Sequence, residues 1–190
     1  MQSQYDMELA CVTQQLTQEE FERGYFVREK SVGALRDDRF FTALFAVLGL
    51  LFLAVKIPEL AQFHWESAIV GLVELLLCLA CVVYQQLVLP QQVLSEASLR
   101  YRTNRTLQCR ETIRITRDGY EIETPYEQIS GYWSETAHCV ESPSWFVFAG
   151  SLGRGTILLP KANLTPEETQ RISEKMQEVF GSRFRRAGRD

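Results

Sequence analysis

A single carboxylate, Glu74, lies within a long apolar run from Ala68 to Gln86. A charged group at the depth of a hydrocarbon layer is costly, and such residues often take part in ion or proton transfer. A relay needs several ionisable groups, and neither apolar run of this chain holds a second carboxylate. We therefore expect a structural role for Glu74, either paired with Lys56 at the end of the other run or in contact with another subunit.

Two cysteine patterns invite a chemical interpretation. Cys78 and Cys81 have C-x-x-C spacing, but redox and zinc pairs need a polar, accessible setting, and these two lie in the apolar run. Free cysteines there behave as small hydrophobic residues. His138 and Cys139 are adjacent, so in a strand they point to opposite faces and cannot act as a base and its nucleophile.

Gly150 to Gly155 reads GSLGRG, which superficially suggests a phosphate loop. A P-loop needs a Gly-Lys-Ser/Thr ending and a following helix, whereas this stretch joins two strand-like segments, so we expect a hairpin loop. Two histidines cannot build a histidine metal cluster, and a pI of about 5.4 disfavours nucleic-acid binding. We therefore predict no catalytic residue, metal, cofactor, nucleic-acid partner or small-molecule substrate, and no enzymatic activity.

Two apolar runs, helical spans of about 39–57 and 67–89, predict a transmembrane hairpin within residues 37–90. The positive charges lie before the first run and after the second, whereas the connecting loop offers only Lys56. By the positive-inside rule both termini face the cytoplasm, which places the protein in a plasma membrane. Five cysteines without disulfide-like spacing agree with a reducing compartment.

Small residues in the two spans recur at spacings of three and four, which keeps them on one face of each helix. The candidate packing face consists of Gly49, Gly71, Cys78 and Cys81. Small residues allow helices to approach closely in lipid, so we expect the two faces to meet. In an antiparallel hairpin this would bring Lys56 and Glu74 to the same end.

The N-terminal segment, residues 1–36, begins with a strand pattern over Glu8 to Thr13. Thr17 and Glu20 then form a capping box that opens a helix. A lone strand is unstable, so this one must pair with a sheet formed by the chain after the apolar runs.

Residues 91–98 form a polar connector, after which the chain carries Arg100, Arg102 and Arg105. Basic residues just inside a membrane attract anionic lipid, at about 1 kcal/mol each near the surface. We name these three arginines as candidate lipid-surface contacts, although the same charges would also serve only to orient the spans.

The last part of the chain alternates like a sheet. ETIRIT and YEIET flank a tight turn at Asp118-Gly119, and further strands are expected at 128–136, 144–149 and 156–159. Thr165 and Glu168 open an amphipathic helix that ends at Gly181. The aromatic residues of these strands are expected in the core or on a sheet face, not in a ligand platform: Trp133, Trp145, Phe146 and Phe148. The basic tail, 182–190, is expected to be frayed.

These features together carry a resemblance: two spans, YRTNRTLQ, the Asp118-Gly119 hairpin, YEQISGYW, and ILLPKANLT before a last helix. The chain resembles the YcxB-like family of bacterial membrane proteins, uncharacterised in activity, best over 99–181. The resemblance implies a C-terminal domain like a pleckstrin-homology barrel. The turn after Arg117 is short and carries an acid, so we do not expect the headgroup recognition typical of such hairpin loops.

The expected fold class is α+β: a two-helix transmembrane hairpin plus a cytoplasmic, antiparallel, pleckstrin-homology-like curved sheet or barrel capped by a C-terminal helix. The expected function is non-enzymatic. An integral membrane protein, in contact with membrane lipid, would use its cytoplasmic domain to bind an unknown protein partner or a second copy of itself. The alternative is an accessory or regulatory subunit of a membrane transporter, acting through an intramembrane helix contact at the Gly71, Glu74 and Cys78 face.

Overall fold

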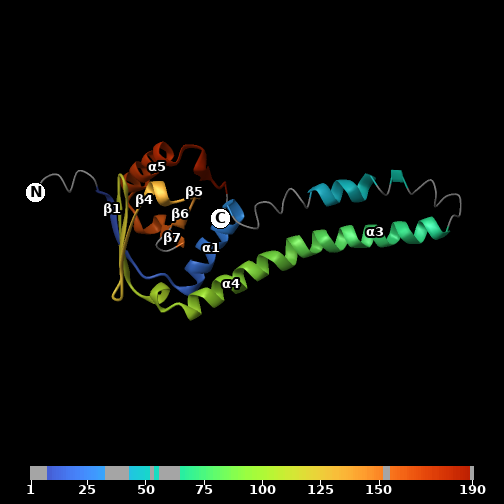
Figure 1. The fold of residues 1–190 in the computed structure, drawn as a ribbon, viewed down its shortest axis with the longest axis horizontal. Coiled ribbons are helices and arrows are strands. Elements are labelled where there is room, and N and C mark those ends of the chain that lie inside the picture. Colours follow the sequence, from blue (N-terminus) through green and yellow to red (C-terminus); the bar gives the residue numbers. More distant parts are fainter. Residues whose placement is uncertain (1–7, 33–42, 52–53, 56–64, 152–154, 189–190) are drawn as a thin grey trace, which may run out of the picture. The chain divides into compact units, whose positions relative to one another are not determined.

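The computed structural model describes residues 8–32, 43–51, 54–55, 65–151 and 155–188 (Figure 1). The fold is α+β, as the sequence predicts. The chain divides into two compact units. One unit combines residues 1–32 with 94–190, and the other comprises 33–93.

The first sheet brings the N-terminal strand together with three strands that follow the apolar runs. It contains β1 (Glu8–Gln14), β2 (Glu111–Thr116), β3 (Gly119–Glu123) and β4 (Gln128–Tyr132), in that order and antiparallel. β1 pairs with β2 along almost its whole length. The strand expected near the N-terminus therefore completes a sheet whose other members lie about a hundred residues away.

The second sheet has the order β7-β6-β5-β8. Its strands are β5 (His138–Glu141), β6 (Trp145–Ser151), β7 (Gly155–Pro160) and β8 (Phe184–Arg186). β8 runs parallel to β5, and the other pairs are antiparallel. The antiparallel pairing that the sequence predicts holds for β1 to β7, which form two sheets, whereas β8 makes the second sheet mixed.

Two strands were missed at the sequence level. β5 has only four residues, too few for a clear alternation. β8 lies in the basic tail that we expected to be frayed. That expectation is wrong, because β8 pairs with β5 and the Ala187 amide donates to the Glu141 carbonyl at 2.8 Å.

The strand expected over 128–136 is also shorter than predicted. β4 ends at Tyr132, and a 3-10 turn, η4 (Trp133–Glu135), follows. Trp133 turns inward there: its Nε1 donates to the Thr116 carbonyl at 3.0 Å, and its ring stacks on Phe148 at 4.8 Å between centroids. Burying this large ring outweighs continued strand pairing.

The two tight connections were predicted correctly. β2 and β3 form the hairpin around Asp118, and β6 pairs with β7 across the glycine-rich stretch that follows Gly150. Gly119 is required by close approach, because a Cβ atom there would lie 2.1 Å from the Gly131 carbonyl oxygen of β4.

The main core lies between both sheets and helix α5 (Pro166–Phe180). Thr165 and Glu168 form the expected capping box, and Gly181 ends the helix at φ +51°. The expected aromatic core is confirmed, with Trp133, Trp145, Phe146 and Phe148 all buried.

Helix α1 (Gln18–Val32) packs on β6 and β7. The Thr17 and Glu20 capping box that opens it is present, with the Glu20 amide donating to Thr17 Oγ1 at 3.2 Å. Gly24 makes close packing possible, since a Cβ atom there would meet the Leu158 side chain at 3.0 Å. With α1 as cover, five consecutive residues of β6 from Trp145 are buried, which explains their unbroken apolar sequence.

From Trp65 the chain is helical through α3 (Trp65–Val83), η2 (Tyr84–Val88) and α4 (Leu89–Thr103). η2 is a π-helical turn immediately before Pro90, which has no N–H and cannot continue the ordinary ladder. In the described part of the chain, one helix is long and apolar enough to cross a membrane: Leu75–Thr103, with mean hydropathy 1.4 over its apolar window.

Candidate functional site

The predicted packing face is partly described. Residues 43–51 and 54–55 are helical, and Gly49 is buried. A Cβ atom at Gly49 would lie 3.7 Å from the Cys78 Cβ, so these two members of the face meet. Cys81 is half-buried, whereas neighbouring residues such as Leu77 are exposed.

The proposed pair of Lys56 and Glu74 stays a prediction. Lys56 lies outside the described residues, and Glu74 is described only as part of the α3 backbone, as is Gly71.

The candidate lipid-contact arginines take three different positions. Arg100 donates to Glu96 on its own helix at 2.7 Å, and Arg102 donates to Gln18 of α1 at 3.2 Å. Arg105 is exposed in the 3-10 turn η3 (Arg105–Gln108). Lipid contact by these residues remains a prediction.

Arg100 also belongs to a pocket of about 630 Å³ at one corner of the 1–32 and 94–190 unit. α1 and the end of α4 contribute one side, and the first residues of β4 and β7 contribute the other. The described lining is Phe21, Tyr25, Arg28, Arg100, Thr103, Asn104, Thr106, Leu107, Glu127, Ile129, Gly155 and Thr156. We call this the Tyr25 pocket.

Two guanidinium groups converge in the Tyr25 pocket. Arg28 Cζ and Arg100 Cζ each lie 5.3 Å from the centroid of the Tyr25 ring. Each arginine therefore gains a cation–π contact with the same ring, although one comes from α1 and the other from α4. Burial, and next the charge of Glu29, raise the pKa of Tyr25 above its ordinary value, so its hydroxyl is neutral at physiological pH.

The two arginines have limited partners. Arg100 pairs with Glu96 four residues earlier, and both side chains are more than half exposed. Arg28 pairs with its neighbour Glu29. Within the described residues Arg28 Nε is buried without a hydrogen-bond partner, which is unusual for a buried donor.

A set of contacts holds α1 and α4 in place beside the Tyr25 pocket. The Tyr101 hydroxyl donates to the Leu16 carbonyl at 2.8 Å, and Gln18 Nε2 donates to Ser98 Oγ at 2.9 Å. The Phe21 and Tyr101 rings pack at 5.7 Å. These contacts fix the relative position of Arg28 and Arg100 before any ligand arrives.

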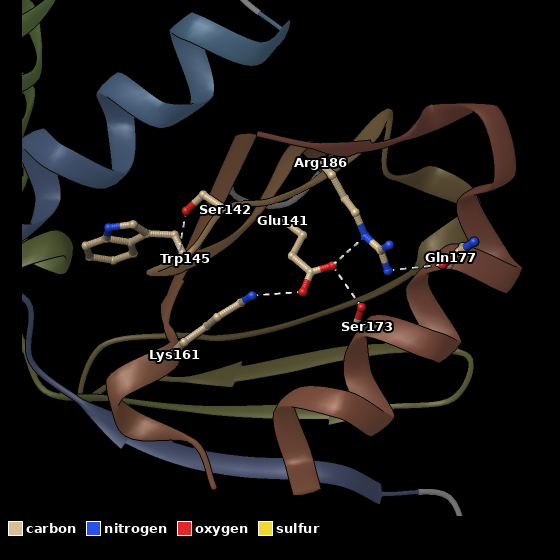
Figure 2. Close-up of polar contacts among 7 residues, drawn as sticks. All are labelled: Glu141, Ser142, Trp145, Lys161, Ser173, Gln177 and Arg186. Carbon is tan, nitrogen blue, oxygen red and sulfur yellow. Dashed lines mark hydrogen bonds and ion pairs between the residues drawn. The ribbon is translucent and has the colours of Figure 1, made fainter. Parts of the chain in front are cut away.

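A second polar cluster centres on Glu141 of β5 (Figure 2). One carboxylate oxygen accepts from Lys161 at 2.8 Å, and the other accepts from Ser173 of α5 at 2.8 Å and Arg186 of β8 at 3.3 Å. Arg186 also donates to Gln177 at 3.3 Å. We call this cluster the Glu141 junction, because it ties α5, β8 and the end of β7 to β5.

The Glu141 junction is electrostatically complete. Burial alone would raise the pKa of Glu141, but hydrogen bonds from Lys161 and Ser173 and the charges of Lys161 and Arg186 hold it below its ordinary value. The same side chains line a shallower pocket of about 490 Å³. The carboxylate of Glu141 is neutralised by Lys161 and Arg186, so the junction is a structural cluster.

The third candidate surface is the outer edge of β4, the last strand in the order of its sheet. Every residue of β4 is exposed or half-buried. Tyr126, just before the strand, is 71% exposed, and Tyr132 at its end is 65% exposed. An uncovered edge between two exposed aromatic residues is suited to pairing with another chain.

The remaining sequence candidates for chemistry are structural. Cys139 is fully buried, and burial strongly raises the pKa of its thiol, so it is not a reactive thiolate. Across the described ranges there is no group of three or more metal-ligating His, Cys, Asp or Glu side chains.

The Tyr25 pocket was not predicted. Tyr25 and Arg28 share a face of α1 by their spacing of three, and Arg100 was chosen as a lipid contact. The sequence contained no signal that joins them, because only the packing of α1 beside α4 brings them together. Comparison with known proteins adds no assignment: no family model, no curated protein and no solved structure matches the chain.

Proposed function

We propose that this protein is an integral membrane protein whose domain formed by residues 1–32 and 94–190 is a non-enzymatic interaction module. The partner is a protein, or a second copy of the chain, that adds an extended segment to β4. The exposed β4 edge is the observation that carries this proposal.

The edges at β1 and β7 support the choice of β4. β1, at the opposite end of the same sheet, is largely buried, and Gln14 at its end donates to the Leu158 carbonyl at 2.8 Å. In the second sheet α1 packs against β7. Strand addition takes its affinity from main-chain hydrogen bonds, so an accessible strand edge is the first requirement.

The pleckstrin-homology-like and YcxB-like assignments belong to this proposal. Support comes from the described strands β1–β7, which form two sheets closed by helix α5. The proposed barrel is interrupted between β1 and β2 by α1 and the apolar segment. We further propose that this segment is a two-span hairpin with both termini in the bacterial cytoplasm, since the positive charges flank it.

The transporter-subunit alternative needs the face of Gly71, Glu74 and Cys78 to be available to another protein. Gly49 of the same chain lies against Cys78. This contact uses part of that face within the chain, so it supports the strand-edge proposal over the intramembrane one.

Photocrosslinking of the full-length protein in membranes tests the proposal. p-Benzoylphenylalanine in place of Ser130 or Tyr132 on β4 should give one discrete adduct. Its mass distinguishes a second copy from another protein. The same residue in place of Gln170 on the exposed side of α5 is the matched control. Equal crosslinking from Gln170 and from the β4 positions would refute the proposal.

A further inference from the structure

We propose that the Tyr25 pocket is a binding site for a phosphate-type anion, which Arg28 and Arg100 bind with their guanidinium groups. The pocket borders the start of β4 through Ile129, but the proposal rests on Arg28 and Arg100 and does not depend on strand addition at the β4 edge. The phosphate group can belong to a soluble molecule or to an anionic lipid headgroup, because the recognising chemistry is the same.

The first argument is the kind and arrangement of the charges. Guanidinium groups are planar, always charged, and match the oxygen geometry of phosphate. Arg28 and Arg100 reach the same 630 Å³ pocket from two helices, each over the Tyr25 ring. An arginine that stacks on an aromatic face keeps the N–H groups at its edge available for an anion.

The second argument is that present partners do not saturate these groups. The pair between Arg100 and Glu96 is a solvent-exposed i,i+4 contact, a class that contributes little to stability and is easily exchanged. Arg28 Nε has no hydrogen-bond partner among the described residues. In the proposed site a phosphate oxygen supplies the acceptor that this donor lacks.

The third argument is the chemistry of the lining. Among the charged residues that line the pocket in the described part of the chain, the two arginines outnumber the one carboxylate, Glu127. Thr103, Asn104 and Thr106 add polar, uncharged groups. Pockets of roughly 300–1,000 Å³ hold small ligands, so a phosphate with an attached organic group fits this volume.

The fourth argument is pre-organisation. The contacts from Tyr101 to Leu16 and from Gln18 to Ser98 hold α1 and α4 together. Arg28 and Arg100 therefore do not need to be brought together when the anion binds, and a site assembled in advance loses less affinity to ordering.

The direct test uses the full-length protein in nanodiscs of phosphatidylcholine. Titration with inorganic phosphate, followed by calorimetry at low ionic strength, measures the soluble source. A parallel set of nanodiscs that contain phosphatidic acid measures the lipid source, read out by the protection of Arg100 from a guanidinium-modifying reagent. Binding in either arm supports the site and identifies which source supplies the phosphate.

Arg100→Gln should lower phosphate affinity at least about tenfold, the effect of losing one charge-assisted contact. Arg28→Gln should do the same if the domain stays folded, which its thermal unfolding will show. The matched control is Arg23→Gln, since Arg23 also makes an exposed i,i+4 pair, with Glu19, but does not line the pocket. Failure to bind in both arms would overturn the proposal, as would an equal loss of affinity in the Arg23 variant.

Discussion

The Glu141 junction and the Tyr25 pocket both gather charged side chains from distant parts of the chain, but they differ in how those charges are satisfied. Glu141 accepts from three different elements, and its oxygens have direct partners. Among the described residues, Arg28 and Arg100 pair only with carboxylates of their own helices, and both line a larger pocket. A saturated cluster stabilises a fold, whereas an unsaturated one beside a cavity is suited to a ligand.

Glu141→Ala should produce the largest loss of stability. It disrupts the Glu141 junction and leaves the Tyr25 pocket unchanged. The change leaves Lys161 and Arg186 without their shared carboxylate, and Lys161 is only 17% exposed. We expect the free energy of unfolding to fall by about 3 kcal/mol, the usual cost of removing one partner from a mostly buried pair. Denaturant titration, followed by tryptophan fluorescence, measures it.

The matched control for that prediction is Glu178→Ala. Glu178 pairs with Lys175 on α5, and its side chain is 71% exposed. The expected change is less than about 0.5 kcal/mol. Equal effects from the Glu141 and Glu178 variants would show that the junction adds no more than a surface ion pair.

Gly24→Leu should have the next largest effect, and it acts on the scaffold of the pocket. A Cβ atom added at this position would lie 3.0 Å from the Leu158 side chain, so a large side chain must push α1 away from the second sheet. We expect a destabilisation of about 2 kcal/mol from overpacking. Because Tyr25 and Arg28 move with α1, phosphate affinity should fall as well. Glu19→Leu is the control, because the Glu19 side chain on α1 is 73% exposed. It should leave stability and phosphate affinity nearly unchanged.

Acid titration should produce a smaller effect, confined to the contribution of the Glu141 junction to stability. The pKa of Glu141 is lower in the folded protein than its ordinary value of 4.5, so its ionised form stabilises the fold above that value. The contribution is lost as the pH falls through the lowered pKa. The stability difference between wild type and Glu141→Gln should therefore be constant from pH 7 to about 5 and shrink below about 4.5. A difference that grows on acidification would contradict this account.

The smallest expected effect on stability is that of Arg100→Gln. Its ion pair with Glu96 is exposed, so the free energy of unfolding should change by less than about 0.5 kcal/mol. The same variant should lose phosphate binding, whereas Glu141→Ala, where it remains folded, should retain it. A large loss of stability in the Arg100 variant would mean that the pocket is a structural cluster like the junction.

Local patterns in the sequence were sufficient for many elements. The capping boxes at Thr17 and Thr165, the turn at Asp118-Gly119 and the end of α5 at Gly181 all form as predicted. Each depends on residues within a few positions of one another, so the chain itself carries the signal. The buried aromatic residues of the sheets were also predicted, because large apolar side chains in alternating segments have few other places to go.

Features that depend on distant pairing were decided only by the tertiary structure. β8 is a basic, three-residue strand that forms because β5 offers an open edge and Glu141 offers Arg186 a counter-charge. The division into two sheets follows from the inward turn of Trp133 against Phe148. Neither partner is visible from the local sequence.

The candidate sites show the same distinction. Local sequence is enough to predict the apolar helix, the flanking arginines and the position of Gly49 and Cys78 on faces able to meet. Only the packed structure placed Arg28 and Arg100 over one tyrosine ring. The physical reason is that periodicity specifies which face of a helix is apolar, whereas packing decides which charged groups from separate helices share one cavity.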